Sequence, residues 1–280
     1  MSTIIQKILF PVDFSTASVA MAVYLKRAAA IFAAEVTIVH VCDLDSHNGF
    51  ELYARPVTDI AREHWNLAGN KLQRFLTSEF PAAKSPRVLL AGDPAAAIVD
   101  HATTNKFDLI VMPTHAGRLR RLMLGSTTAR VLGAAACPVL TTQHAETAAP
   151  RSLEHRKWVC ASGLGANSER VLSYASRLSL ATAATLSLVH AVEASEPESE
   201  VPSRQEYLAR QRIAELQSRS GSAAAVRIAV GPVKETLLNA VVEEGADVLV
   251  IGRSRHNASG RLDDLTYSLV RDSPCPVVSV

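Results

Sequence analysis

The sequence of 280 residues carries one pattern twice, and this repeat limits the folds that the chain can adopt. The matched segments keep a nearly constant spacing, which is 150 residues near the start of each copy, 139 further on and 138 at the end. Offsets this consistent indicate a duplicated domain of about 140 residues. The matches pair residues 8–18 with 158–168, 36–43 with 186–193, 107–111 with 246–250 and 137–139 with 275–277.

Within each copy, short apolar runs alternate with segments of helical periodicity. Such runs are typical of parallel strands buried on both faces. Five strands alternating with four helices predict a doubly wound α/β domain with a five-stranded parallel sheet and helices on both faces. In the first copy the predicted strands are Ile4–Val12, Val36–Cys42, Arg87–Ala91, Leu109–Met112 and Cys137–Leu140, and the predicted helices are Ala17–Ala34, Thr58–Glu79, Ala95–Thr104 and Ala129–Ala135.

A polar segment after Thr142 predicts a linker, so we expect domains at residues 1–147 and 153–280. The second copy opens with a predicted strand at Lys157–Ser162, a helix at Ser168–Ala181 and a strand at Ala184–Val192. The segment Val192–Ser203 is rich in Glu, Ser and Pro, which predicts a mobile loop.

Composition narrows the function classes. Apolar residues make up 48% and charged residues 20% of the chain, as in globular proteins with a full core. The net charge of +2 is too small to indicate a nucleic-acid or membrane partner. The four cysteines have no CxxC spacing, and the start of the chain lacks a signal-type segment. We therefore expect a cytoplasmic protein with reduced thiols.

The stretch from Asp108 to Leu140 predicts a strand, a loop, a helix and a strand. The loop ends in Gly125, Ser126 and Thr127, small residues at the predicted start of a helix. Such a start attracts anions through its N–H groups and the helix dipole. The stretch is therefore consistent with a phosphate cradle, or with a helix start packed tightly on the sheet.

Together these segments resemble the universal stress protein family in its tandem two-domain form. The resemblance is carried by ILFPVDFS, by GDP before the third helix, and by DLIVMPTH, LRRLMLGSTTARVL and CPVL. It implies an adenine nucleotide alpha hydrolase-like fold and, for ATP-binding members, the pattern Gly-x2-Gly-x9-Gly-Ser/Thr after the fourth strand. In this chain the loop is one residue shorter, Pro113 takes the first glycine position and the second glycine is displaced to Gly117.

The resemblance implies a stress-response protein that binds ATP, AMP or another adenine nucleotide, with or without Mg²⁺, in its first domain. In such members an aspartate after the first strand contacts the nucleoside. The expected nucleotide-binding residues are Pro11, Val12, Asp13, Val41, Met112, Pro113, His115, Gly117, Gly125, Ser126 and Thr127. Asp13 is also suited to cap the first helix.

The second copy departs from this pattern. Gly163 stands in place of Asp13, and Asp263-Asp264-Leu265 in place of Gly125-Ser126-Thr127. Two carboxylates beside a phosphate site repel a polyanion, so we expect no nucleotide in the second domain.

Other features leave alternatives open. Without a Ser-His-Asp order, a metal-ligand cluster or a Walker motif, we expect at most weak ATP hydrolysis. A nucleotide-independent interaction protein and an enzyme of adenylate chemistry remain alternatives. His40 and His190 recur at equivalent positions, which predicts a hydrogen-bonded structural role. The apolar last strands, Val139–Thr142 and Val277–Val280, predict pairing of the two domains, and a homodimer stays open.

Overall fold

The computed structural model describes residues 4–43, 57–114, 123–143, 156–193, 204–253 and 262–280. Contacts group the chain into two compact units, residues 1–139 with 144–147 and residues 140–143 with 148–280. Among the helices of the described ranges, none is both long and apolar enough to cross a membrane. Residues 194–203 of the predicted mobile loop Val192–Ser203 and most of the predicted linker lie outside the described residues.

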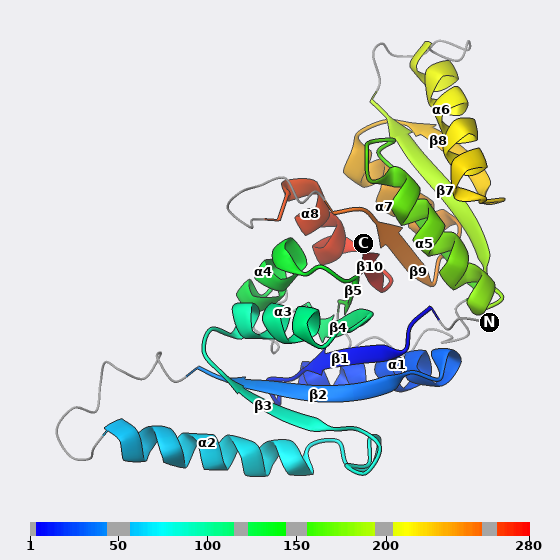
Figure 1. Cartoon of the computed structure of the whole chain (residues 1–280). Coiled ribbons are helices and arrows are strands. Elements are labelled where there is room, and N and C mark those ends of the chain that lie inside the picture. The colour runs from blue at the N-terminus through cyan, green and yellow to red at the C-terminus, as the bar shows by residue number, and fades with distance from the viewer. Residues whose placement is uncertain (1–3, 44–56, 115–122, 144–155, 194–203, 254–261) are drawn as a thin grey trace. The chain divides into compact units, whose positions relative to one another are not determined.

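The elements of the two repeats follow each other in the same order (Figure 1). The first repeat contains β1 (Lys7–Pro11), α1 (Thr16–Phe32), β2 (Glu35–Cys42), α2 (Val57–Arg74), β3 (Arg87–Ala91), α3 (Pro94–Thr104), β4 (Leu109–Pro113), α4 (Ser126–Ala134) and β5 (Val139–Thr142). The second contains β6 (Lys157–Ala161), α5 (Ser168–Ala181), β7 (Thr185–Val192), α6 (Arg204–Ser220), β8 (Ala225–Val230), α7 (Val233–Glu243), β9 (Val248–Ile251), α8 (Asp264–Asp272) and β10 (Val277–Ser279).

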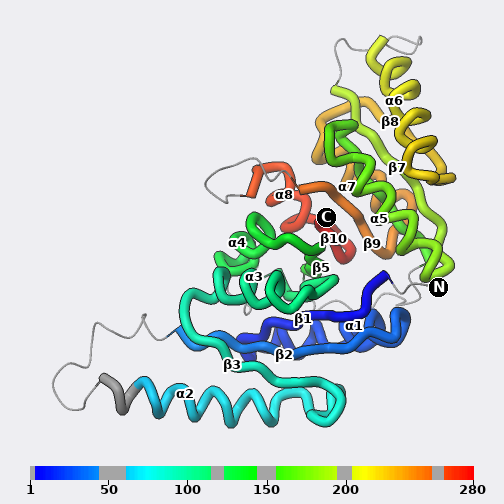
Figure 2. Tube along the Cα trace, in the orientation of Figure 1, coloured from blue at the N-terminus to red at the C-terminus, as the bar shows by residue number. Residues whose placement is uncertain are grey.

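Each repeat forms a doubly wound sheet. The strand order is β3-β2-β1-β4-β5 in the first repeat, and β8-β7-β6-β9-β10 in the second. The chain runs from β1 out to β3 and then returns to the other side of β1 as β4 (Figure 2). In each repeat the first strand pairs in parallel with both neighbours. Because the strand order reverses beside β1 and beside β6, the carboxyl ends of these strands are the places where sheets of this kind bind ligands.

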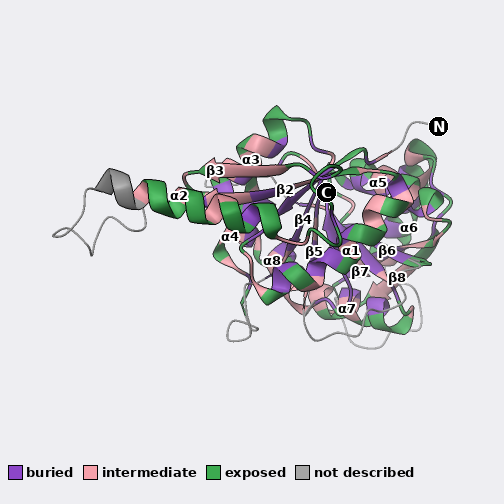
Figure 3. Cartoon of the chain, turned by 90° about the horizontal axis from the view of Figure 1, so that it is seen from below, coloured by how far each residue is buried: buried purple, intermediate pink, exposed green. Residues whose placement is uncertain are grey.

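Burial follows the strand runs that the sequence predicted. Ile8, Leu9 and Phe10 of β1 have no exposed surface, and neither do Val248, Leu249 and Val250 of β9. Figure 3 shows buried strands and helices whose outward faces are exposed. Continuous apolar runs therefore mark central strands covered on both faces.

The predicted helix Thr58–Glu79 is too long, because α2 ends at Arg74. Leu76 adopts a left-handed conformation with φ of 51°, which ends regular helix geometry. The guanidinium of Arg87 donates to the carbonyls of Phe75, Phe80 and Ser85, so the chain after α2 turns around this side chain. The apolar spacing through Phe75 extended the predicted helix past that turn.

The turn after the first strand is strained in the same way in both repeats. Phe14 has φ of 62° and the equivalent Leu164 has φ of 56°. Bulky residues rarely adopt the left-handed region. This turn places residue 13 in the first repeat, and residue 163 in the second, beside the carboxyl ends of the strands.

Candidate functional site

A cavity of about 350 Å³ lies at the carboxyl ends of β1, β2 and β4 in the first repeat. Its walls come from the turn after β1, the end of β2, the end of β4 and the start of α4. Of the residues predicted to bind a nucleotide, it is lined by Pro11, Val12, Asp13, Val41, Met112, Pro113, Gly125, Ser126 and Thr127. His115 and Gly117 lie outside the described residues.

Asp13 is oriented by its own turn. Its Oδ1 accepts hydrogen bonds from Ser15 N at 3.0 Å and from Ser18 Oγ at 2.7 Å. Partial burial would raise the pKa of Asp13, but these hydrogen bonds outweigh it, and the pKa lies below its ordinary value. The carboxylate is therefore ionised at neutral pH. Both of these hydrogen bonds go to Oδ1, which leaves Oδ2 able to accept a hydrogen bond from a ligand hydroxyl.

The cap of α1 is Ser15 rather than Asp13. The side chain of Ser15 accepts from Ser18 N at 3.2 Å, which satisfies a first-turn donor of α1. Asp13 is therefore not the cap of the first helix, although the sequence suggested that it could be. Asp13 instead supports the turn that precedes the helix.

The start of α4 supplies donors to the same cavity. The first N–H groups of a helix have no intrahelical acceptor, and here the N-cap is Gly125, which has no side chain with which to cap them. Thr128 Oγ1 donates to Pro113 O at 3.0 Å, and Gly125 N donates to Thr114 O at 2.7 Å, which fixes the helix start against the end of β4. The arrangement presents uncapped backbone donors to the cavity.

Sequence reasoning did not select every residue of the wall. His40 was predicted to be structural, and its Nδ1 does lie 2.7 Å from Val12 O. Because a carbonyl only accepts, Nδ1 carries the proton. The centroid of its ring lies 4.3 Å from that of Phe14, with the two rings tilted by 39°. The lining residues that the sequence did not predict for the nucleotide site are Ser18, Val39, His40, Pro94, Ile98 and Thr128. The hydroxyls of Ser18 and Thr128 could have been found by their spacing from Asp13 and Gly125.

The equivalent edge of the second repeat has a different chemistry. His190 Nδ1 lies 2.7 Å from Ser162 O, so the structural hydrogen bond of the histidine is repeated. The start of α8, however, is capped by Asp263, whose two oxygens accept from Thr266 N at 2.8 Å and Thr266 Oγ1 at 2.7 Å. At the start of α8, therefore, one of the first backbone N–H groups is already bonded to Asp263. The carboxylate of Asp263 also lies at the position that Gly125 holds in α4.

The profile of the universal stress protein family matches residues 5–143 and 155–280. The chain belongs to the universal stress protein family. A universal stress protein of Methanocaldococcus jannaschii is 33% identical over 145 residues, which cover 49% of this chain and 82% of the relative.

Solved universal stress proteins share the fold. The crystal structure of one from Archaeoglobus fulgidus matches with a TM-score of 0.71 and 19% identity, covering 98% of this chain and 95% of that chain. The crystal structure of a putative universal stress protein from Pseudomonas aeruginosa matches with a TM-score of 0.65 and 18% identity, covering 99% of this chain and 93% of that chain. The two matches of the family profile show that the chain holds two tandem universal stress protein domains.

Proposed function

We propose that the first repeat of this universal stress protein binds an adenine nucleotide, ATP or AMP, and that binding changes its conformation or its partners. One observation carries the proposal. The ionised carboxylate of Asp13 and the uncapped start of α4 at Gly125 line the same cavity. A cavity of about 350 Å³ falls in the range of small-molecule sites.

The two ends of the cavity match the two ends of a nucleotide. Phosphate oxygens would accept from the N–H groups at the start of α4, where the helix dipole adds attraction. A ribose hydroxyl would donate to Oδ2 of Asp13, and the base would pack beside Val41 and Met112. Where Mg²⁺ accompanies ATP, phosphate oxygens themselves are its usual ligands. Within the described ranges no group of three His, Cys, Asp or Glu residues forms a separate metal site.

Calorimetry tests this proposal. Wild-type protein should bind one ATP or AMP per chain, and Gly125→Val should block the close approach of phosphate to the backbone. The matched control is Gly165→Val in the second repeat, where an added Cβ has no atom within 4 Å and which should bind ATP as the wild type does. Equal affinity of Gly125→Val and wild type would overturn the proposal.

Mass spectrometry of the denatured protein provides a second test, because it would detect nucleotide carried through purification. A protein that carries no nucleotide and shows no thermal shift with added nucleotide would instead favour a nucleotide-independent interaction role.

We also propose that the two domains pair through their last strands. Val139 and Val277 are buried apolar residues of short strands at the ends of their repeats. A strand at the edge of a sheet has unpaired backbone groups that another strand can satisfy. A fragment of residues 1–147 should therefore dimerise in light scattering, and a well-folded monomeric fragment would contradict the pairing.

A further inference from the structure

β8 is the outermost strand in the sheet of the second repeat, and two of its apolar side chains reach the surface. Within the described ranges it pairs with β7 on one side and with no strand on the other. Val226 and Val230 are 40% and 52% exposed. Outer strands are usually guarded by proline, by charges or by a bulge, because their free backbone groups can pair with another chain. β8 contains no proline, pairs with β7 in unbroken register and has one charged residue, Arg227.

The equivalent strand of the first repeat is better guarded. The offset of 139 residues pairs Arg87 of β3 with Val226 of β8, and Ala91 with Val230. The guanidinium of Arg87 donates to three carbonyls of the chain after α2, so it holds that chain at the start of β3. The two repeats therefore differ at this edge, where β3 begins with a cation and β8 has exposed valine.

The backbone groups of β8 that face outward belong to its apolar residues. Gly231 N donates to Val192 O at 2.9 Å, so the N–H group of Gly231 points towards β7. Successive backbone groups along a strand point in alternate directions. The N–H and C=O groups of Val226, Ile228 and Val230 therefore point away from β7, towards the open edge.

We propose that β8 pairs in antiparallel fashion with β8 of a second copy of this chain, with Ile228 opposite Ile228 of the other copy. In this register every outward backbone group meets an outward group. Val226 lies opposite Val230, so the exposed valines of one copy cover those of the other. Arg227 lies opposite Ala229. The strand is thus complementary to itself, which is why the expected partner is a second copy rather than an unrelated peptide.

Other antiparallel registers are less favourable. A shift by one residue would bring inward-facing backbone groups opposite outward-facing ones. A shift by two residues in one direction places the two Arg227 side chains opposite each other, and like charges at such positions are destabilising. A shift by two in the other direction places Val226 opposite Pro232, which has no N–H group to donate.

The charge of Arg227 does not lie among the valines. Arg227 forms ion pairs with Glu243 and, at 3.9 Å, with Glu244 at the end of α7. Because side chains alternate along a strand, Val226 and Val230 lie on the other face of the sheet. Pairing would therefore gather the apolar side chains of both copies on one face and leave each arginine with its own carboxylates.

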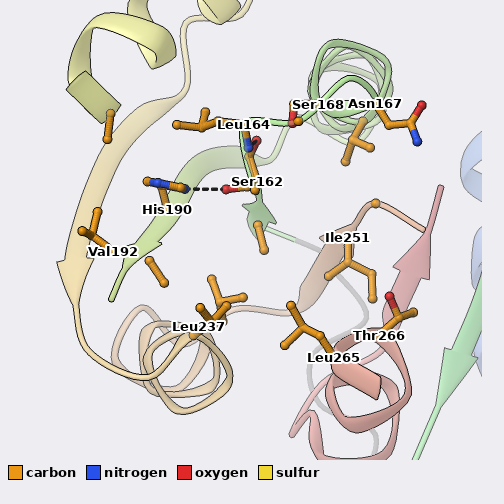
Figure 4. Close-up of a pocket in the computed structure, with 18 of the residues that line it drawn as sticks. Ser162, Leu164, Asn167, Ser168, His190, Val192, Leu237, Ile251, Leu265 and Thr266 are labelled. Carbon is orange, nitrogen blue, oxygen red and sulfur yellow. Dashed lines mark hydrogen bonds between the residues drawn. The ribbon is translucent and has the colours of Figure 1, made fainter. Parts of the chain in front are cut away.

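The edge of β8 lies apart from both cavities. The pocket of the second repeat, of about 860 Å³, is lined by residues of β6, β7 and β9 and of the surrounding helices and turns, but by none of Ala225–Val230 (Figure 4). None of these residues lines the first cavity either. Dimerisation through β8 is therefore independent of the nucleotide proposed for the first repeat, and the two proposals can fail separately.

Sedimentation of the full chain over a concentration series tests the pairing. Wild type should form dimers, and Val226→Lys with Val230→Lys should weaken them by roughly tenfold or more, because lysine then lies opposite lysine. Val226→Glu with Val230→Lys places opposite charges across the pair and should keep the dimer. The control is Ala91→Lys at the equivalent position of β3, which should leave the dimer unchanged. Circular dichroism checks that each variant folds.

Three outcomes of sedimentation would overturn the proposal. They are a wild type that stays monomeric, a dilysine variant that dimerises as the wild type does, and a Glu/Lys variant that dissociates as readily as the dilysine one.

Disulfide formation tests the register directly. Val226→Cys with Val230→Cys in one chain should give a covalent dimer under mild oxidation, because the facing Cα atoms would lie about 5.5 Å apart. Either substitution alone should give none, because like positions of the two copies would lie roughly 13 Å apart. Peptide mass spectrometry identifies the bond. A disulfide that joins position 226 to position 226, or its absence in the double variant, would refute the register.

Discussion

Helices α4 and α8 occupy equivalent places in the two repeats, but they begin differently. Gly125 leaves the first-turn donors of α4 uncapped, whereas Asp263 caps α8 with both oxygens of its side chain. The residue at this one position thus decides the character of the helix start. With glycine the start can receive an anion, whereas with aspartate it already carries an anionic cap. The difference shows how two copies of one fold can differ at a helix start, with one start left open to an anion and the other stabilised by its own cap.

The largest effect is expected when the first helix start is converted into the second. Gly125 has φ of −59° and ψ of 141°, a conformation open to aspartate. Gly125→Asp should therefore cap α4 and place a negative charge beside the phosphates, reducing ATP affinity at least a hundredfold in calorimetry. Gly125→Asn supplies the cap without the charge and should give an intermediate loss. Retained affinity in Gly125→Asp would show that phosphate does not bind at α4.

The second effect concerns the nucleoside end of the site. Asp13→Ala removes the carboxylate and one ligand hydrogen bond, which should weaken ATP by about 1–3 kcal/mol in calorimetry. The reciprocal change, Gly163→Asp, should create no ATP site, because Asp263 still occupies the start of α8. A second bound ATP in Gly163→Asp would mean that the two helix starts are not what separates the repeats.

The cap itself should stabilise the second repeat. Asp263→Ala leaves Thr266 N without its acceptor and should lower the free energy of unfolding by about 0.5–2 kcal/mol in urea denaturation. Asp263→Asn keeps an acceptor for Thr266 N, and because asparagine caps a helix about as well as aspartate, it should leave the free energy of unfolding nearly unchanged. Equal losses in the two variants would argue that Asp263 does not act as a cap.

The smallest expected effect is a difference in the free energy of unfolding at low pH. The hydrogen bond from Arg271 lowers the pKa of Asp272 to about 2, against partial burial, and Lys234 contributes further lowering. Because this folded-state pKa lies below the ordinary value of 3.8, the group stabilises the fold above about pH 4, and this contribution is lost as the pH falls towards 2.

Asp272→Asn should therefore lower the free energy of unfolding at pH 7 by about 0.2–1 kcal/mol, as is usual for ion pairs near the surface. Unfolding curves of wild type and variant should converge near pH 2. The equivalent residue of α4 is Ala134, and α4 is tied to α3 instead by Arg130 and Asp93, 2.6 Å apart. A gap between the curves that does not change with pH would exclude ionisation as its cause.

The fold could be predicted closely because its signals are local and repeated. Buried strands such as β4 are continuous apolar runs, and the duplication let each copy support the interpretation of the other. The end of α2 was missed because it depends on Arg87, a residue distant in sequence that binds the carbonyls of the turn. Amphipathic spacing alone does not reveal such a contact.

The candidate site was only partly predictable. The positions of Asp13 and Gly125 follow from the strand ends at which they stand, and the structure brings both to one cavity. The sequence indicated the repulsive charge of Asp263 but not its hydrogen bonds to Thr266, which depend on the local helix geometry. A pocket of about 860 Å³ at the equivalent edge of the second repeat was not predicted, because its lining comes from segments that lie far apart in the sequence.

The left-handed turn after the first strand has a consequence for the history of the duplication. Phe14 and Leu164 share no chemistry beyond being apolar, yet both hold a backbone conformation that costs an ordinary side chain about 1–3 kcal/mol. The second repeat has Gly163 where the first has Asp13 beside that turn, yet both repeats have the same strained backbone. The bend therefore belongs to the architecture inherited by both copies, so new ligand specificities can evolve on either repeat by changing side chains around a fixed corner.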